Sequence, residues 1–166
     1  EFNNWVKGGY AKFKCFQGAT ANQLLTYVEP TLKEESFKAA ILHVGVIDLL
    51  QNKNKMTDVE KIENLIENLK LTANKCISYG ISKIFVSGIV ISDRLPLSVV
   101  RDANSKIIDM CNEYSFIFVD NSNILHSNHF YDGLHLAESG KRILANNFIG
   151  RLNCFLTPRN QSQIKT

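Results

Sequence analysis

The sequence predicts an α/β fold in which helices cover both faces of a parallel sheet. Short runs rich in β-branched and aromatic residues alternate with longer segments whose apolar residues recur every three or four positions, which is typical of such a fold. The 166 residues are the length of one domain. A content of 45% hydrophobic and 21% charged residues is that of a globular protein and excludes a disordered or collagen-like chain.

The first predicted elements are a strand and a helix. Residues 12–16 alternate polar and apolar side chains, which is typical of a short strand, and Gly18 then breaks the pattern. Thr20 is the expected N-cap of a helix over residues 21–29, because its hydroxyl can accept a hydrogen bond from a backbone N–H of the first turn. Pro30 follows this helix and is expected to end it.

The next strand and helix carry clear boundary signals. Residues 39–44 form a compact apolar run, typical of a strand covered on both faces, and Gly45 ends it. Thr57 and Glu60 have the spacing of a capping box and predict the start of a long helix. Apolar residues then recur at three- and four-residue spacing as far as Gly80, the expected stop.

The C-terminal half continues the alternation. Strands are predicted over residues 82–90 and 116–119, and helices over residues 97–114 and 139–152. The loop between the last strand and the last helix is rich in Asn, Ser, His and Asp. The polar segment 157–166 is predicted to be a frayed tail.

Charge and cysteine content exclude several kinds of site. The 19 basic and 16 acidic residues give a net charge of +3 and are spread along the chain, so no nucleic-acid surface is predicted. The cysteines lie far apart without a Cys-x-x-Cys pair, which argues against structural zinc, and each lies in an apolar stretch typical of a buried free thiol. These residues are Cys15, Cys76, Cys111 and Cys154. No metal or organic cofactor is implied, and no apolar run is long enough to cross a membrane.

The sharpest chemical feature is the motif Asp-Gly-Leu-His at residues 132–135. A carboxylate three residues before a histidine can hold one ring nitrogen, fix the tautomer and leave the other nitrogen free as a base. The motif therefore predicts Asp132 and His135 as a catalytic pair. The alternative interpretation has Asp132 as a turn former and His135 as a residue at the entry of a helix.

Two glycine turns are the other candidate segments, and both follow predicted strands, where ligands of parallel sheets bind. Gly45 lets the backbone pass close to a ligand. His43, just before it, is interpreted as a core histidine, and Asp48 as a cap for a short helix. Gly18 can present a backbone N–H to an oxyanion, although a glycine in a turn needs no function.

In this order and spacing, the three segments resemble the conserved blocks of the SGNH (GDSL-type) hydrolases, a family of esterases and lipases. The resemblance covers residues 13–152 and is closest to esterase-like domains of animal genomes, some of them encoded by LINE-type retrotransposons. It implies a three-layer α/β/α fold with a flavodoxin-like parallel sheet and hydrolysis of carboxylic esters. It also implies that His135 is the base and Asp132 orients it. Gly18 and Gly45 would contribute to the oxyanion hole.

Two departures from the family pattern predict that this polypeptide is inactive. The Gly-Asp-Ser block, which carries the family's nucleophile on an inner strand, occurs nowhere in the 166 residues. Ile47 stands where the family has the Asn of the oxyanion hole, and an isoleucine side chain has no hydrogen-bond donor. Removing a comparable serine lowers the rate by roughly 10⁶, and losing one oxyanion donor by roughly 10²–10³.

The sequence therefore predicts a hydrolase-like domain over residues 1–156 that lacks the first strand of the family fold. If active, it would act on a small ester or acylated substrate. The alternative is a non-catalytic binding or assembly module of the same fold, from a mobile-element protein. A nucleotide-binding domain is disfavoured because no P-loop or Gly-x-Gly-x-x-Gly pattern occurs. Residues 1–7 do not resemble a secretory signal, which slightly favours an intracellular protein, and no oligomeric state is predicted.

Overall fold

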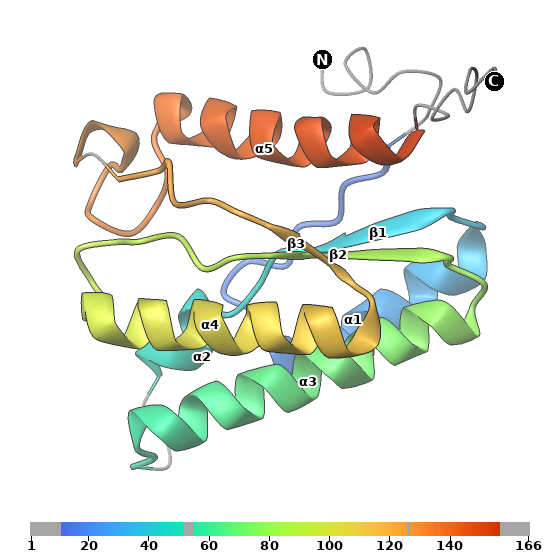
Figure 1. Cartoon of the computed structure of the whole chain (residues 1–166), viewed down its shortest axis with the longest axis horizontal. Coiled ribbons are helices and arrows are strands. Elements are labelled where there is room, and N and C mark those ends of the chain that lie inside the picture. The colour runs from blue at the N-terminus through green and yellow to red at the C-terminus, as the bar shows by residue number, and fades with distance from the viewer. Residues whose placement is uncertain (1–10, 52–54, 126, 157–166) are drawn as a thin grey trace, which may run out of the picture.

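The computed structural model describes residues 11–51, 55–125 and 127–156, which form an α/β fold (Figure 1). Three parallel strands pair in the order β1-β2-β3. The strands are β1 (Ala39–Leu42), β2 (Lys83–Ser87) and β3 (Ile117–Val119). The predicted class, an α/β protein with a parallel sheet, is confirmed, although each strand is shorter than its apolar run.

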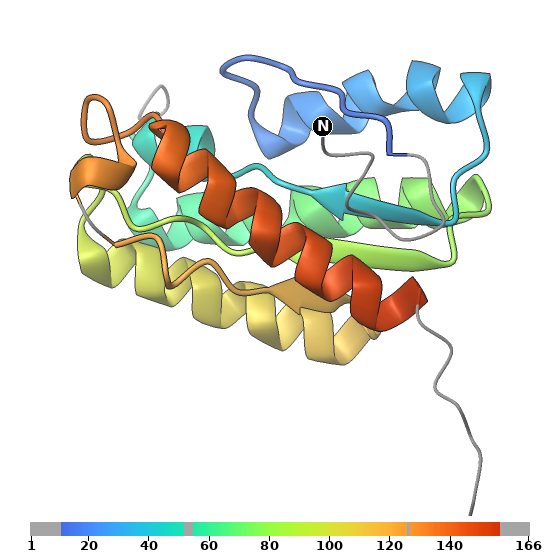
Figure 2. The ribbon, with the colours of Figure 1, turned by 90° about the horizontal axis from the view of Figure 1, so that it is seen from above.

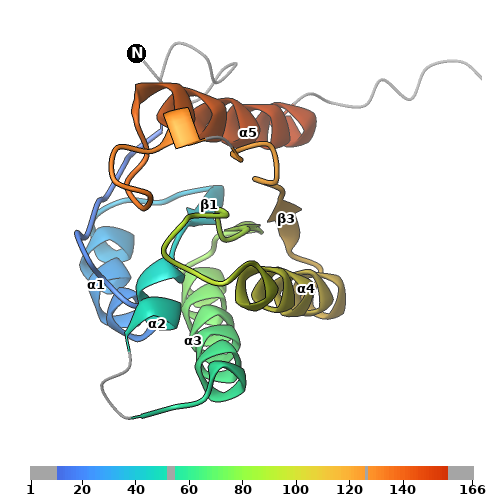
Figure 3. The ribbon, with the colours of Figure 1, turned by 90° about the vertical axis from the view of Figure 1, so that its left-hand side faces the viewer.

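Helices cover both faces of this sheet. The longer ones are α1 (Ala21–Glu34), α3 (Asp58–Ser78), α4 (Leu97–Tyr114) and α5 (Glu138–Leu156), and the short ones are α2 (Val46–Leu50) and a 3-10 turn, Ser127–His129. Helices α1 to α4 lie on one side, and α5 lies on the other, with the 3-10 turn beside its start (Figure 1 and Figure 3). Seen from above, α5 crosses the strands at an angle, and α1 lies beyond the outer edge of β1 (Figure 2).

The central strand β2 shows why the apolar runs are continuous rather than alternating. Ile84 and Val86 point into the core cluster formed with α3 and α4. Phe85 points the other way, where its ring meets that of Phe155 on α5 at 6.3 Å between centroids. Since both faces are covered, neither set of side chains can be polar, and all three residues are buried.

The predicted cap of α1 is confirmed, but its predicted end at Pro30 is wrong. Thr20 and Gln23 form a capping box, in which each side chain satisfies a backbone N–H of the other residue. The helix continues through Pro30 to Glu34 because α1 packs along α3, and this packing outweighs the one backbone hydrogen bond that proline cannot donate. Pro30 itself is exposed.

The predicted strand over residues 12–16 does not form. A strand is defined by a neighbour that takes its backbone hydrogen bonds, and β1 pairs only with β2 in the described part of the chain. The segment instead runs beside α1: Lys12 forms ion pairs with Glu34 and Glu35 at the far end of the helix. Near the middle of the helix, the ring centroids of Phe16 and Tyr27 lie 5.0 Å apart.

The prediction of four buried thiols is confirmed for Cys76 and Cys111 and wrong for the other two. Burial raises the pKa of each buried thiol to about 11. Cys15 is exposed because its segment joins no sheet, and Cys154 is exposed on α5. Among the described helices none is long and apolar enough to cross a membrane. Residues 1–7 and the tail 157–166, for which predictions were made, lie outside the described residues.

Candidate active site

The predicted catalytic pair is in direct contact in the loop before α5. Nδ1 of His135 lies 2.8 Å from Oδ2 of Asp132. The other carboxylate oxygen, Oδ1, accepts hydrogen bonds from the backbone N–H groups of Leu134, at 3.1 Å, and His135, at 2.8 Å. The carboxylate therefore orients both the backbone of the loop and the imidazole ring. With Nδ1 held, Nε2 of the exposed ring is left for chemistry.

The hydrogen bonds around Asp132 also fix its charge. The backbone N–H and the ring of His135, followed by the N–H of Leu134, hold the pKa of the Asp132 carboxyl well below its ordinary value of 3.8. Asp132 is thus an anion at any pH near neutrality, as an orienting carboxylate must be. The Asp132 side chain is exposed, so solvent screens these interactions. The lowered pKa therefore indicates that the carboxylate is held in one orientation, and not that it stabilises the fold strongly.

A second loop, between β2 and α4, supports this turn. The backbone N–H of Asp93 donates to the carbonyl of Gly133 at 3.0 Å, and Nε of Arg94 donates to the carbonyl of Asp132 at 3.3 Å. Gly133 has a φ of +78°, and a Cβ at this position would lie 3.2 Å from the Cβ of Asp93. Glycine is favoured here by its backbone conformation, and a Cβ would also press on the side chain of Asp93 in the neighbouring loop.

Gly18 and Gly45 are both turns, but they differ in exposure. Gly18 has a φ of +68°, and no atom lies within 4 Å of the place that a Cβ would take, so this turn is open to solvent. Gly45 is buried, with a φ of +128° and the Cδ1 atom of Ile89 at 2.5 Å from the Cβ position. Gly45 is therefore explained by packing, whereas the backbone at Gly18 remains accessible to a ligand.

Asp48 does not cap α2 as predicted but joins α2 to α1. Gly45 is the N-cap of α2, and Asp48 lies inside its first turn. Both carboxylate oxygens of Asp48 lie 3.0 Å from the backbone N–H of Ala21, the first residue of α1. Burial raises the pKa of Asp48. The bond ties the turn at Gly18 to the segment after β1, so two of the three predicted segments are linked.

The remaining predicted site residues are not joined to the catalytic pair. Ile47 is half-buried in α2 and offers no side-chain donor. Among the described residues, no hydrogen bond connects Asp132 or His135 to Gly18, Gly45 or Ile47, and no serine is hydrogen-bonded to His135.

Sequence analysis did not predict that polar residues at the carboxyl ends of the strands form a hydrogen-bonded cluster. Asn121, buried just after β3, donates from Nδ2 to Ser87 Oγ and to the carbonyl of Gly88, each at 2.8 Å. Its Oδ1 accepts from Asn147 of α5 at 3.0 Å. The sequence feature that could have predicted this cluster is an asparagine shortly after an apolar strand, because polar side chains of parallel sheets gather at the carboxyl ends of the strands.

His43 completes this cluster, and its interpretation as a satisfied core histidine is confirmed for the hydrogen bonding of its ring but not for the burial of the residue. Its Nδ1 lies 2.8 Å from Ser87 Oγ, and its ring packs edge-on against that of Phe148 at 5.7 Å. The residue nevertheless keeps an exposed surface, because β1 is the edge strand of the described sheet. Desolvation of the ring by the surrounding protein lowers the pKa of His43 to about 4, so it is neutral at pH 7.

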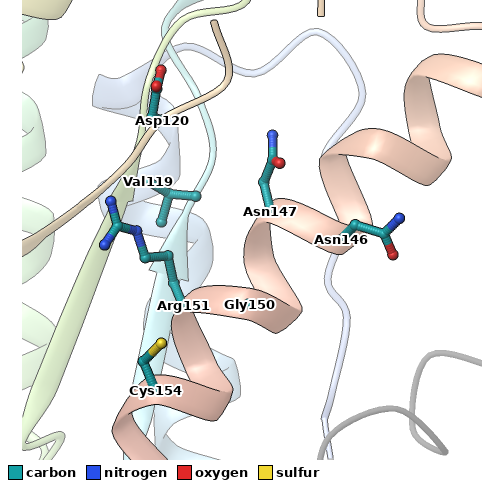
Figure 4. Close-up of a pocket in the computed structure, with 7 residues that line it drawn as sticks. All are labelled: Val119, Asp120, Asn146, Asn147, Gly150, Arg151 and Cys154. Carbon is teal, nitrogen blue, oxygen red and sulfur yellow. The ribbon is translucent and has the colours of Figure 1, made fainter. Parts of the chain in front are cut away.

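A hollow of about 370 Å³ lies between β3 and α5 (Figure 4). It is open and is lined by Val119, Asp120, Asn146, Asn147, Gly150, Arg151 and Cys154. None of the predicted site residues lines it. No group of three or more His, Cys, Asp or Glu residues with the geometry of a metal site occurs in the described part of the chain.

Comparison with solved structures places this arrangement in a known fold. A protein of Bacteroides fragilis assigned as an acylhydrolase superposes with a TM-score of 0.73 at 15% identity, covering 84% of this chain and 73% of that chain. The fold is that of solved ester hydrolases. An acetylxylan esterase of Geobacillus stearothermophilus gives a TM-score of 0.65 at 14% identity, covering 81% of this chain and 68% of its own. Another acetyl xylan esterase gives 0.67 at 14% identity, covering 82% and 77%.

In sequence, no protein-family profile matches the chain, and no curated protein matches it. Two of the solved structures are catalytic mutants of the Geobacillus enzyme. In one an aspartate is replaced by alanine, and in the other a histidine three positions later is replaced by alanine.

Proposed function

We propose that the chain is a domain of the ester-hydrolase type in which Asp132 and His135 are the orienting carboxylate and the base. The observation that carries the proposal is the 2.8 Å contact between Asp132 Oδ2 and His135 Nδ1. It is supported by the same aspartate–histidine spacing at the catalytic positions of the Geobacillus acetylxylan esterase, whose fold the chain shares. A carboxylic ester, such as an acetyl ester, is the substrate class that this likeness favours.

We further propose that the 166-residue polypeptide does not turn over esters. A base accelerates ester hydrolysis by taking the proton of a nucleophile, and no described serine is within hydrogen-bond distance of His135. The sequence contains no Gly-Asp-Ser, and Ile47 cannot donate a hydrogen bond to an oxyanion. A strand that pairs with the outer edge of β1 is the element that would bring a nucleophile to this end of the sheet.

The test compares the chain with a version that carries an additional N-terminal strand with Gly-Asp-Ser, alone and together with Ile47→Asn. Hydrolysis of a short-chain chromogenic acetate is measured for each. The unmodified chain is expected to show no turnover above the background, the double modification to hydrolyse the acetate, and His135→Ala in that variant to abolish the reaction. Turnover by the unmodified chain that His135→Ala removes would contradict the proposed inactivity.

A non-catalytic binding or assembly module of the same fold, derived from a mobile-element protein, is the second candidate. It is favoured by the isoleucine at position 47, where the family pattern has the Asn of the oxyanion hole, since a protein under no demand for catalysis tolerates this residue. If the doubly modified version folds and hydrolyses no acetate, this second candidate replaces the first.

A further inference from the structure

We infer that His43 is a ligand-binding residue of this site, held by Ser87 as the neutral Nε2–H tautomer so that Nε2–H donates to an oxygen of a bound ester or carboxylate. The inference rests on the proposed function for the class of ligand. It adds a donor at the strand ends that the family resemblance does not assign.

The tautomer follows from counting the hydrogens around Ser87. Its Oγ already accepts a hydrogen bond from Asn121, at 2.8 Å. Its own hydrogen can go to Nδ1 of His43, at 2.8 Å, or to the carbonyl of Gly88, at 3.4 Å. The carbonyl lies at the limit of hydrogen bonding and already accepts from Asn121. Ser87 therefore donates to Nδ1, which leaves the single ring proton of neutral His43 on Nε2.

The position of Asn121 makes this arrangement rigid. Its side chain is 2% exposed, and both of its N–H groups and its carbonyl oxygen are used, by Ser87, Gly88 and Asn147 respectively. The amide cannot flip without losing all three bonds, so Oγ of Ser87 stays an acceptor toward Asn121 and a donor toward His43. A donor that is fixed before the ligand arrives loses little conformational entropy on binding.

The other side of the imidazole is available. Among the described residues, Nδ1 of His43 is hydrogen-bonded and Nε2 is not, and the residue is exposed. The ring follows β1 at the carboxyl end of the sheet, two residues before Gly45, and ligands of open parallel sheets bind along this edge. A neutral N–H at such a place suits an oxygen acceptor. Since Ile47 provides no donor in the same segment, His43 is the side chain that can.

The tautomer is tested directly by long-range ¹H–¹⁵N spectra of the ¹⁵N-labelled chain near pH 7. We expect the Nε2–H pattern for His43, and a mixture of tautomers in Ser87→Ala. An Nδ1–H pattern in the unmodified chain would refute the inference.

Binding is tested by titrating sodium acetate, the product of acetyl-ester hydrolysis, against the same spectra, with sodium chloride holding the ionic strength constant. We expect the Nε2 signal of His43 to shift with saturation. His43→Phe, which keeps the packing on Phe148, is expected to weaken acetate binding about tenfold, the effect of losing one hydrogen bond to a charged group. His43→Gln, which retains an N–H donor, is expected to restore most of the affinity.

The outcomes separate this inference from the proposed function. If acetate shifts the signals of His43 but the version with an added nucleophile strand hydrolyses nothing, the inference stands and the catalytic proposal fails. If that version hydrolyses esters while His43→Phe changes neither its KM nor acetate binding, the catalytic proposal stands and His43 is not a ligand-binding residue.

Discussion

At the scale of single residues, replacing Asp132 is expected to change both the backbone of its loop and the ring of His135. It accepts from two backbone N–H groups and from the ring of His135. In Asp132→Ala we expect the amides of Leu134 and His135 to lose their protection from hydrogen exchange and the ring of His135 to lose its Nδ1–H preference. Both are read by NMR on one sample.

Asp120→Ala is the matched control, because Asp120 forms a similar turn with Ser122 earlier in the loop. Loss of exchange protection at Leu134 in the control would contradict the assignment.

Some residues of the candidate site could be predicted from the sequence and others could not. The pair Asp132 and His135 could be found because its partners are three residues apart, and local spacing is legible in a sequence. The cluster of His43, Ser87 and Asn121 joins positions more than thirty residues apart, and its members are adjacent only because three strands run in register. Asp48 was misassigned for the same reason: its partner, Ala21, belongs to another helix.

At the scale of elements, Glu29 joins α1 to α3 and gives a pH-dependent prediction. The ammonium of Lys75 at 2.8 Å, then Lys33 and the hydroxyl of Tyr79, lower the pKa of Glu29 from 4.5 to about 2. A pKa lowered by folding means that the contact is fully present above pH 4.5 and is lost as the pH falls through about 2.

The measurement is a carboxyl ¹³C titration of Glu29. Lys75→Ala, which removes the largest influence, is expected to raise the pKa of Glu29 toward 4.5, and Lys33→Ala to raise it less. The reverse order, or an unchanged pKa in Lys75→Ala, would show that α1 is not held to α3 by this ion pair.

Element ends were the least predictable feature, and α1 shows the cause. Its start is encoded locally by Thr20 and Gln23, and was predicted correctly. Its end is set by packing on α3, because of which the helix continues beyond Pro30. The local sequence does not predict that packing. The strand predicted over residues 12–16 does not form for the same reason. A strand needs a neighbouring strand to pair with, and the sequence of the segment itself does not show whether one is present.

At the scale of the whole molecule, the two layers around the sheet are attached in different ways. The layer of α3 and α4 buries a continuous apolar core, and the alternation of strands and helices predicted it. On the other face lies α5, and beside its apolar contacts it is fastened through Asn147 to Asn121 at the strand ends. A buried polar contact holds position well but destabilises the fold when one partner is lost.

Asn121→Ala should therefore loosen α5 before the rest of the molecule. The substitution removes the hydrogen bonds that Asn121 makes to Ser87, to the Gly88 carbonyl and to Asn147, which costs about 2–4 kcal/mol of unfolding free energy, measured by urea denaturation. Hydrogen exchange should rise in α5 more than in α4, because only α5 is tied to Asn121. Asn123→Ala is the control: Asn123 is exposed, and among the described residues its side chain bonds only to Asn147, so its loss should cost under about 1 kcal/mol. Equal exchange increases in α4 and α5 would instead mean that the two layers unfold as one unit.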